Sequence, residues 1–478
     1  MLIGENPMDY YELRSVLSHI IPREKPLLFE KRKAGFISTT KGRKQNYHEF
    51  KINQNKWVKQ ERLLNDQVIG SFIKISCRAA ACPMPLNLDV WDGIVCPFGC
   101  KYCFANLFRA GIYTMFFDNG KTLGLRHCNP TKYKKEMDEL FKQRDKNPHD
   151  VSNSLAKAIA MGLPIRFGIR FEDFIQAEAK KGISLELLNY LADHDYPIMI
   201  NTKSDLVGHD RYVDALCRTK SAVHVTLISS NNKILKALEP NAPSYERRLE
   251  AMRILSSAGV RVVARIEPYL VHVTDQKEDV ERYIKDVWDA GVRNITFDTY
   301  SYTARNAGIR QSFRNEGIDY DRLFLLGCDS QALGSLLLGS FMQMFRDAGF
   351  SCSTFDMGNV PDNDQNICCE VGDWFGSGFN YGCTVMATRF IQRRKGLETT
   401  WKDFERWVDA HGGFLSDALK HEVHQLWNCE GNDAYSHSWA RGLEAVGSDS
   451  SGLVWIWKDT DFRKDLYDNI SKDLDVPK

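Results

Sequence analysis

Short apolar, β-branched runs alternate with amphipathic stretches through residues 88–301 of the chain. Alternation of this kind is typical of parallel strands that are joined by crossover helices. We expect six strands, at 88–95, 164–171, 197–203, 222–229, 261–269 and 294–300, and helices that include 185–193, 211–218, 244–258 and 277–290. The pattern therefore predicts an α/β fold built from six βα units.

The clearest of these helices is 244–258, in which Leu249, Met252 and Leu255 line one side and Gly259 supplies a stop signal. In barrels of parallel strands the reactive groups come from the carboxyl ends of the strands. We therefore expect the chemistry of this chain to lie at those ends.

Different patterns flank the βα units. Residues 22–60 hold eleven basic residues against three acidic ones, interleaved with Phe29, Phe36, Tyr47, Phe50 and Trp57. Basic charge beside aromatic rings favours contact with a nucleic-acid backbone and its bases, and the alternative is a solvated arm. After the units we expect a helix at 331–348, a strand at 351–357 and helices at 401–410 and 416–427. Three parts follow: a basic N-terminal extension at 1–86, a barrel at 87–305 and a mixed C-terminal region at 306–478.

Composition restricts the class of protein. Hydrophobic residues make up 43% and charged residues 26% of the 478 positions, and the formal net charge is +1, so a nucleic-acid surface would have to be local. We find no basic-then-apolar leader and no apolar run of the roughly 18 residues that a membrane span needs. The 13 cysteines are irregularly spaced, which indicates reduced thiols and metal ligands and not a disulfide framework. We therefore expect a soluble, cytoplasmic protein without a membrane partner.

Three of those cysteines, Cys96, Cys100 and Cys103, lie in the sequence Cys-Pro-Phe-Gly-Cys-Lys-Tyr-Cys. This spacing places three thiolates on one tight loop around an iron–sulfur cluster and leaves one iron without a protein ligand. Thiolates suit such clusters, and Gly99 lets the backbone bend between the first two ligands. A structural zinc site needs four ligands, and no second Cys-x-x-Cys pair follows.

The C-x3-C-x2-C loop resembles the signature of the radical S-adenosylmethionine (SAM) superfamily, with the aromatic Tyr102 before the last cysteine. The resemblance extends to the spore photoproduct lyase-like, or DNA repair photolyase-like, branch. It is carried by Cys100-Lys-Tyr-Cys-Phe-Ala105, Ile200-Asn-Thr-Lys-Ser204, Leu238-Glu-Pro-Asn-Ala-Pro243 and Ala258-Gly-Val-Arg-Val-Val263. It implies a partial (β/α)6 TIM-type barrel and a [4Fe-4S] cluster whose open iron is chelated by SAM. An electron from the cluster would then cleave SAM to a 5′-deoxyadenosyl radical.

The resemblance also implies cofactor contacts for Tyr102 and four other residues. Gly168 and Glu172 occupy the second-strand block that shapes the SAM pocket, where Glu172 would accept a hydrogen bond from the SAM amino group. Lys203 would bind the SAM carboxylate, and Thr226 would lie near the ribose or carboxylate. The alternatives are a Glu172 paired with a strand arginine and a Thr226 that is merely a good strand former.

Two further pairs of charged residues are candidates. Glu239 and Arg248 could pair and fix the loop that covers the cofactor. Arg265 and Glu267 alternate inward on the fifth strand, where charges must be paired or functional, which makes them candidate substrate or SAM contacts.

The chain also departs from the branch, because the second-strand block lacks the cysteine that returns a hydrogen atom to the product in spore photoproduct lyase. Cys128, Tyr300 and Tyr302 are alternative donors. A second metal site is an open alternative to core packing for Cys328, Cys352, Cys368, Cys369, Cys383, Cys429, His421, His424 and His437. Cys77 and Cys82 read as structural.

These expectations combine into a radical SAM enzyme, lyase-like or modifying, that abstracts a hydrogen atom from DNA, RNA or a nucleotide-like substrate in repair or base modification. It would receive its electron from flavodoxin or ferredoxin. One alternative keeps the enzyme class but takes a protein or small-molecule substrate. Another is a metal-stabilised nucleic-acid-binding protein without catalysis.

Overall fold

The computed structural model describes residues 9–20, 68–69, 74–75, 84, 86–93, 96–103, 125–169, 171–300, 313–319, 332–354, 369–374, 383–411, 417–430 and 443–457. The basic, aromatic segment at 22–60 lies outside the described residues. Cys77, Cys82, Cys328, Cys368, His437 and Tyr302 lie outside them as well.

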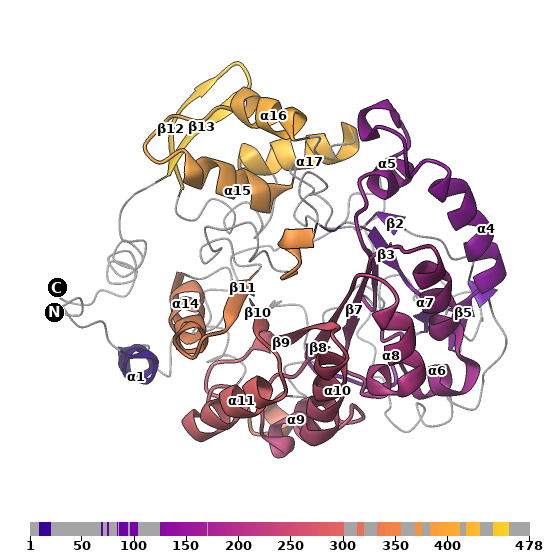
Figure 1. The fold of residues 1–478 in the computed structure, drawn as a ribbon. Helices are drawn as coiled ribbons and strands as arrows, with labels where there is room; N and C mark the ends of the chain where they lie inside the picture. Colours follow the sequence, from indigo (N-terminus) through magenta and orange to yellow (C-terminus); the bar gives the residue numbers. More distant parts are fainter. Residues whose placement is uncertain are drawn as a thin grey trace, which may run out of the picture.

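An eight-stranded sheet forms the centre of the structure, in the order β11-β10-β9-β8-β7-β6-β3-β2 (Figure 1). Seven of its strands are parallel, and β2 pairs antiparallel with β3. The strands are β2 (Lys74–Ile75), β3 (Leu86–Leu88), β6 (Ile165–Phe167), β7 (Ile198–Thr202), β8 (Ser221–Thr226), β9 (Arg261–Tyr269), β10 (Asn294–Thr299) and β11 (Ser351–Thr354). The predicted α/β fold with a partial barrel is thereby confirmed.

Helices cover one face of this sheet, as the ring around the strands in Figure 1 shows. They are α4 (Pro130–Phe141), α5 (Ser154–Ala160), α6 (Gln176–Lys181), α7 (Ile183–Asp193), α8 (Asp210–Cys217), α9 (Asn232–Leu238), α10 (Tyr245–Ser257), α11 (Lys277–Asp289) and α14 (Ala332–Asp347). Local signals start several of them: Ser244 caps α10 by accepting from the Arg247 N–H, and Asn231 caps α9 in the same way. Short 3-10 helices lie at Pro148–Asp150 (η3) and Leu206–Gly208 (η4).

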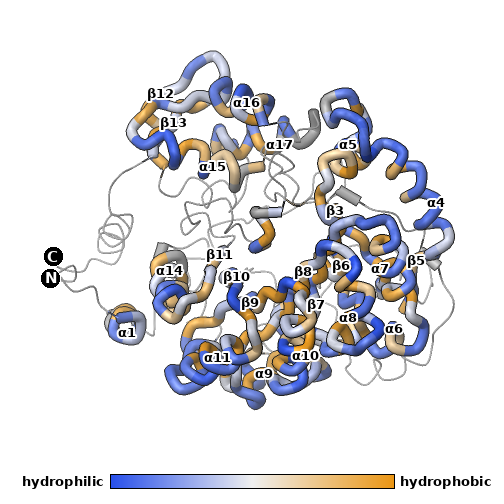
Figure 2. Tube along the Cα trace, viewed as in Figure 1, coloured by the Kyte–Doolittle hydropathy of each residue, from blue (hydrophilic) through white to orange (hydrophobic). Residues whose placement is uncertain are grey.

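The two faces of the sheet differ in chemistry because strand side chains alternate. The outer face, which packs against the helices, is buried and apolar: Leu86, Leu88, Ile165, Phe167, Ile198, Ile200, Val223, Val225, Val262, Ala264, Ile266, Ile295, Phe297 and Cys352. In Figure 2 the apolar strands lie inside a ring of helices whose hydrophilic stretches lie toward the periphery. Burial of each large apolar side chain contributes about 1.5–3 kcal/mol.

The opposite, inner face is mostly polar. By the strand register it carries Asn87, Arg166, Asn201, His224, Thr226, Arg265, Glu267, Asn294, Thr296, Asp298, Ser351 and Ser353, with Met199, Ala222 and Val263 as apolar exceptions. Arg265 and Glu267 therefore point inward, as the period-two pattern predicts. A polar interior does not favour folding by itself, so these groups must be paired or used.

The first strand differs from the prediction of a strand at 88–95. The strand in the central sheet, β3, ends at Leu88, and β4 (Trp91–Asp92) instead belongs to a three-stranded sheet with β1 (Val68–Ile69) and β5 (Arg126–Cys128). The reason is a buried carboxylate: Asp173 Oδ1 accepts hydrogen bonds from the Val90 and Trp91 N–H groups at 3.1 and 2.9 Å. Those N–H groups are therefore not available to a neighbouring strand.

The central sheet also extends beyond the six predicted units. Strand β11, predicted at 351–357, pairs in parallel with β10, and α14 packs against both strands. Phe341 and Phe345 of α14 contact Phe297 of β10, with ring centroids 6.0 and 5.1 Å apart. Helix α1 (Tyr10–Ile20) lies against α14 through Tyr10 and Phe341. Sequence beyond residue 305 thus continues the same sheet.

The remaining C-terminal elements gather at the top of Figure 1. They are α15 (Thr384–Arg393), α16 (Trp401–Ala410), α17 (Asp417–Trp427) and the antiparallel hairpin of β12 (Leu443–Asp449) and β13 (Gly452–Trp457). Indole rings hold them together: Trp427 Nε1 donates to Leu453 O at 2.7 Å, and Trp455 Nε1 donates to Trp427 O at 3.1 Å. The helices predicted at 401–410 and 416–427 are confirmed.

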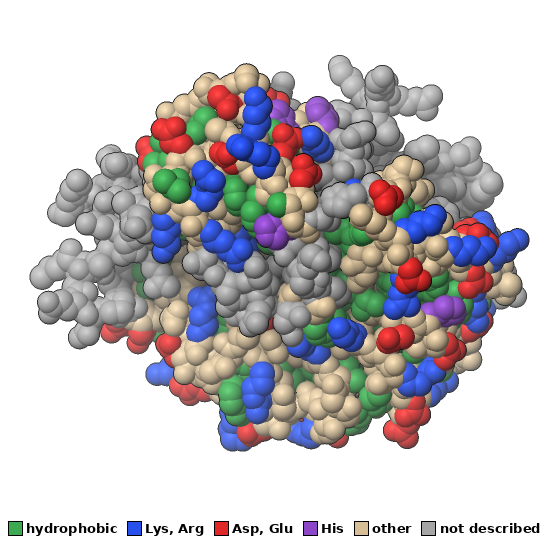
Figure 3. Space-filling model, turned by 45° about the horizontal axis from the view of Figure 1, so that its top comes forward, with side chains coloured by type: hydrophobic (Ala, Val, Ile, Leu, Met, Phe, Trp, Pro, Cys, Tyr) green, Lys and Arg blue, Asp and Glu red, His purple; other side chains and the backbone are tan. Residues whose placement is uncertain are grey.

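Charged side chains of both signs are interspersed over the face shown in Figure 3, in line with the small net charge. Within the described part of the chain, no helix combines the length and the apolar character that a membrane span requires.

Candidate active site

The cysteine loop, residues 96–103, lies beyond β3 and folds back on itself. The Gly99 N–H donates to Cys96 O at 3.1 Å, and the Cys103 N–H donates to Cys100 O at 3.3 Å. Gly99 has φ +65°, a left-handed conformation that glycine adopts without the Cβ penalty. The two turns bring three thiols, none of them in a disulfide, onto one short loop.

A second segment, between α9 and α10, anchors this loop. The Lys101 N–H donates to Leu238 O at 2.8 Å, and the Asn241 N–H donates to Phe98 O at 3.3 Å. The Asn241 side-chain amide donates to Pro97 O at 2.9 Å. Backbone groups near all three cysteines are thereby satisfied, and the loop is held in place by hydrogen bonds to this segment.

A buried ion pair completes the anchor. The Tyr102 hydroxyl donates to Glu239 Oε1, and Arg248 Nη1 lies 2.6 Å from Glu239 Oε2. The side chains of Glu239 and Arg248 are both fully buried. Arg248 also donates to Thr226 O at 2.9 Å and to Pro243 O at 2.8 Å, so it ties the end of β8 to the start of α10. The predicted pairing of Glu239 with Arg248 is confirmed. In this structure Tyr102 is an anchor of the loop.

The three thiols fit a cluster better than a single ion. Burial raises the pKa of Cys100 well above its usual value, Lys203 opposes that rise, and Cys103 and Cys96 are close enough to add to it. Within the described residues, no group of three or more His, Cys, Asp or Glu side chains converges on one metal ion. One tetrahedral zinc would need sulfurs about 3.8 Å apart, given Zn–S bonds of about 2.3 Å. A cluster distributes its thiolates over different irons and does not need that convergence.

Lys203 follows the last residue of β7 and faces this loop. Its ammonium lies 5.5 Å from the ring centroid of Tyr102. Burial lowers the pKa of Lys203, but Cys100, Glu239, Cys103 and Glu172 more than offset this, so the net pKa is raised and the side chain stays charged. No ion pair of Lys203 occurs among the described residues. This leaves the ammonium available to a carboxylate ligand.

Glu172 holds the backbone next to Lys203. Its Oε1 accepts from Thr202 Oγ1 at 2.6 Å and from the Phe174 N–H at 3.1 Å, and its Oε2 accepts from the Lys203 N–H at 2.9 Å. Burial raises the pKa of Glu172, and these three hydrogen bonds oppose the rise. The geometry gives Glu172 a positioning role toward the lysine. Its bond to the SAM amino group stays a prediction.

Gly168 and Asp173 form a second fixed point at the end of β6. The Gly168 N–H donates to Asp173 Oδ2 at 2.7 Å, and Gly168 has φ +74°. A Cβ on Gly168 would lie 2.0 Å from Asn201 O, so the close approach that requires glycine is to strand β7. Asp173 is fully buried and joins β6 to the segment before the cysteine loop. Sequence reasoning missed this role, although the Gly-x4-Asp spacing was a signal for it.

Glu178 is another buried carboxylate with a structural role. It accepts from Trp91 Nε1 at 2.9 Å, from the Tyr212 hydroxyl at 3.0 Å and from the Ser184 and Leu185 N–H groups at 2.8 and 3.0 Å. All of its partners lie on the outer side of the fold, so it supports the site only through Trp91.

Two inward-facing groups lie further round the mouth of the barrel. Thr226 ends β8 with a buried side chain. Arg265 and Glu267 of β9 form an ion pair, and Glu267 Oε1 accepts from Thr296 Oγ1 at 2.6 Å. The predicted cofactor contacts are Tyr102, Gly168, Glu172, Lys203 and Thr226. In the structure all of them lie toward the carboxyl ends of the strands from β3 to β9.

The opposite, amino-terminal end of the barrel is covered by residues 369–374. Glu370 is buried and accepts from Asn294 Nδ2 at 2.9 Å and from Ser351 Oγ at 2.8 Å, at the first residues of β10 and β11. Arg261, the first residue of β9, donates to Glu370 O at 3.0 Å and lies 5.1 Å from the Trp374 ring centroid. This segment, which includes η7 (Gly372–Trp374), forms a floor that sequence reasoning did not anticipate.

The other candidates lie elsewhere. Cys352, Cys369 and Cys383 are buried in the apolar core, and His424 Nε2 donates to Ser451 O at 2.7 Å within the C-terminal unit. Those candidate cysteines and histidines that the structure describes do not come together as a group that could bind a metal ion. The predicted second metal site therefore gains no support from these residues. Burial raises the pKa of Cys128 to about 12. It lies in β5, outside the central sheet.

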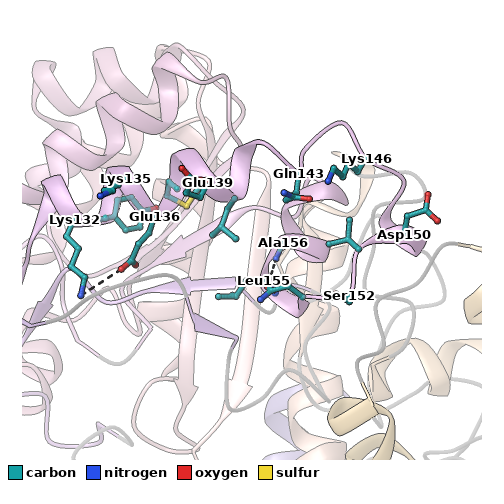
Figure 4. Close-up of a pocket in the computed structure, with 15 residues that line it drawn as sticks. Lys132, Lys135, Glu136, Glu139, Gln143, Lys146, Asp150, Ser152, Leu155 and Ala156 are labelled. Atoms are coloured by element: carbon teal, nitrogen blue, oxygen red, sulfur yellow. Dashed lines mark hydrogen bonds and ion pairs between the residues drawn. The ribbon is translucent and has the colours of Figure 1, made fainter.

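A groove of about 1020 Å³ lies along α4 and α5 on the outside of the barrel (Figure 4). Apolar and polar side chains line it, and its charged residues are of both signs: Lys132, Lys135, Lys146, Glu136, Glu139 and Asp150. None of the cysteines and none of the predicted cofactor contacts line this groove, so it is separate from the candidate active site.

Comparison with known proteins finds a family model that matches the part of the chain that carries these residues. Residues 93–287 match the family model described as the radical SAM superfamily. An uncharacterised protein of Acidianus two-tailed virus is 30% identical over 129 residues, which cover 26% of this chain and 42% of the relative. An uncharacterised protein of Mycobacterium bovis is 21% identical over 220 residues, which cover 46% and 59%. The chain thus spans about half the length of these curated relatives.

Two kinds of solved structure are similar to this chain. One is spore photoproduct lyase with bound AdoMet and dinucleoside spore photoproduct, at 14% identity and a TM-score of 0.36, covering 52% of this chain and 65% of that one. The other is SuiB of Streptococcus suis bound to the precursor peptide SuiA, at 14% identity and a TM-score of 0.34, covering 57% and 49%.

The family implies SAM and an iron–sulfur cluster, and the loop, Lys203 and the barrel ends are consistent with both. Residues 93–287 of this chain form a radical SAM domain.

Proposed function

We propose that this enzyme cleaves SAM reductively and abstracts a hydrogen atom from a nucleic-acid or nucleotide-like substrate, in lyase-like repair or base modification. A [4Fe-4S] cluster on Cys96, Cys100 and Cys103, with SAM on its open iron, would supply the electron and the radical. The protein's own task is to hold a C–H bond of the substrate in place and to keep water away.

Each named residue has a role in that task. Lys203 binds the SAM carboxylate as a point charge, and Glu172 fixes the backbone that carries the lysine. Gly168 and Thr226 shape the walls of the SAM site. Tyr102 holds the cysteine loop to Glu239 and thereby keeps three thiols in place.

One observation carries the proposal. An ammonium without an ion pair among the described residues faces three thiols on a loop that hydrogen bonds anchor to the rest of the protein. A metal site with a purely structural role does not need a lysine ammonium that faces its thiols. A SAM site needs a cation beside the cluster, because SAM would chelate the open iron through the carboxylate that the cation also contacts.

The substrate class rests on the sequence and on the inner face of the sheet. The blocks shared with the spore photoproduct lyase-like branch favour nucleic acid, and the polar inner face offers hydrogen-bonding groups to a base. The missing second-strand cysteine means that a hydrogen donor, if the reaction needs one, comes from another group; Tyr300 is buried at the end of β10. Flavodoxin or ferredoxin is the expected electron donor.

The test is isotopic. The protein is reconstituted without oxygen and given dithionite, SAM and oligonucleotides deuterated on the sugar or base. The proposal expects deuterium in 5′-deoxyadenosine or in recovered SAM. Ample SAM cleavage without label from any DNA or RNA would instead favour a protein or small-molecule substrate. Bound zinc and no 5′-deoxyadenosine would favour the non-catalytic alternative.

A further inference from the structure

The inner face of the sheet carries a contiguous patch of three side chains, Asn201, His224 and Arg265. Asn201 of β7 and His224 of β8 lie directly opposite each other in the strand register. Arg265 lies on β9, opposite Thr226, and so two residues further along than His224. Side chains at opposed and diagonal positions of adjacent strands are within contact range of one another.

His224 is 2% exposed, yet its Nε2 has no hydrogen-bond partner among the described residues. Burial lowers the pKa of His224, and the positive charges of Arg265 and Arg166 lower it further. A hydrogen bond from the ring to the backbone of Cys369, in the floor segment, opposes this, but the net pKa lies well below its usual value. The histidine is therefore neutral at physiological pH. Because Nδ1 is the remaining nitrogen for the Cys369 carbonyl, it carries the proton and Nε2 is an acceptor.

The neighbours of His224 complete a pattern of hydrogen-bonding groups. Asn201 Oδ1 is a second buried acceptor without a partner, and Arg265 Nε is a buried donor without one. The other end of the Arg265 guanidinium is held by Glu267, which fixes its orientation. Unpaired buried polar atoms are costly and rare in native proteins, so three on one patch indicate a ligand that satisfies them.

The pattern restricts the ligand. Phosphate and carboxylate groups have no donors, so they would leave both acceptors unpaired. A trans peptide group directs its N–H and C=O to opposite sides, so it cannot present both to one patch. A cis-lactam presents an N–H beside a C=O on one rigid edge, which satisfies the arginine and one acceptor, and a primary carboxamide shares this edge. The imide edge of thymine or uracil has only one N–H and leaves the second acceptor unpaired. Guanine adds an exocyclic N–H beside its lactam and satisfies all three atoms.

We propose that Asn201, His224 and Arg265 form a recognition subsite for the lactam edge of a guanine-type nucleobase that enters the barrel from the carboxyl end. This inference rests on the proposed function. The floor at residues 369–374 closes the other end and holds His224 in its orientation. A base extruded from its stack can be read by such a pocket on its Watson–Crick edge.

Binding to the reconstituted holoenzyme with SAM tests the subsite independently of turnover. The probes are an oligomer with one guanosine and the same oligomer with N1-methylguanosine, which carries equal charge but lacks the N1–H donor. Wild-type protein should bind the first roughly threefold to tenfold more tightly, as the loss of one neutral hydrogen bond implies. His224→Leu should abolish the difference, and His224→Gln, which keeps an acceptor, should retain part of it.

The matched control is His194→Gln at the end of α7, where the ring contacts Tyr190 of α7 and Asp138 of α4 in the helical layer, so the discrimination should be unchanged. SAM cleavage without substrate reports that each variant is folded and loaded. Equal discrimination by His224→Leu and wild type overturns the subsite, as does an absence of discrimination in wild type. Tight, His224-dependent binding of a glutamine-containing peptide alone also overturns it. Failure of the proposed function shows separately, as a lack of deuterium transfer from any nucleic acid.

Discussion

Replacement of Glu239 by Gln tests the anchor of the cysteine loop. The change removes the charge opposite Arg248 but keeps an oxygen for the Tyr102 hydroxyl. Because both side chains of the ion pair are fully buried and their charged atoms lie 2.6 Å apart, the arginine is left charged without a partner. Breaking one side of a buried pair costs about 3–5 kcal/mol, so we expect a loss of that size in the free energy of unfolding.

The assay is urea denaturation followed by tryptophan fluorescence, with iron retention measured on the same samples. The double variant Glu239→Gln/Arg248→Met should lose less than the sum of the single variants, by about 1–3 kcal/mol, because it removes both charges together. The neighbouring Arg247 is the control: it pairs with Asp205 at the surface, and Arg247→Met should cost less than about 1 kcal/mol. A Glu239→Gln protein that keeps its iron and unfolds within 1 kcal/mol of wild type would refute the reasoning.

Three other predictions follow from the site. Lys203→Ala should weaken SAM binding by about 10- to 150-fold, which corresponds to the 1.5–3 kcal/mol of a charged hydrogen bond. Anaerobic calorimetry measures the SAM affinity, and iron assays should show an unchanged iron content. Equal SAM affinity of the variant and wild type would exclude the lysine as the carboxylate ligand. Gly168→Ala should lower the melting temperature clearly more than the control Gly162→Ala. Both glycines have positive φ, but only a Cβ at position 168 would lie 2.0 Å from Asn201 O. Equal decreases in melting temperature for the two variants would contradict this. In cluster-free protein, iodoacetamide should modify Cys100 most slowly of the three loop thiols, and this reaction should become faster as the pH rises. The reason is that burial raises the pKa of Cys100 and keeps its thiolate fraction low at neutral pH. Mass spectrometry of the modified peptides measures the order of reaction.

Several parts of this account were visible in the sequence because their signals are local. The strand at 261–269 and the helix at 401–410 have the predicted bounds, since period-two and period-3.6 patterns with clear caps define them. The cysteine spacing and the Thr-Lys-Ser turn likewise placed Cys96, Cys100, Cys103 and Lys203 at strand ends. The structure brings these groups to one mouth of the barrel.

What the sequence did not reveal depends on contacts between distant segments. The strand predicted at 88–95 ends early because Asp173, more than 80 residues away, takes the N–H groups of Val90 and Trp91. The floor formed by Glu370 depends on Asn294 and on a loop whose own pattern is uninformative. No local periodicity reports such long-range hydrogen bonds, and they determine where the cleft is closed.

The most direct measurement is the iron, sulfide and 5′-deoxyadenosine content of anaerobically reconstituted protein after reduction in the presence of SAM. The account predicts a four-iron, four-sulfide cluster and 5′-deoxyadenosine in wild type, and the loss of both in a variant with Cys96, Cys100 and Cys103 replaced by Ala. Stoichiometric zinc with no SAM cleavage, or a cluster that persists in the triple variant, would contradict it.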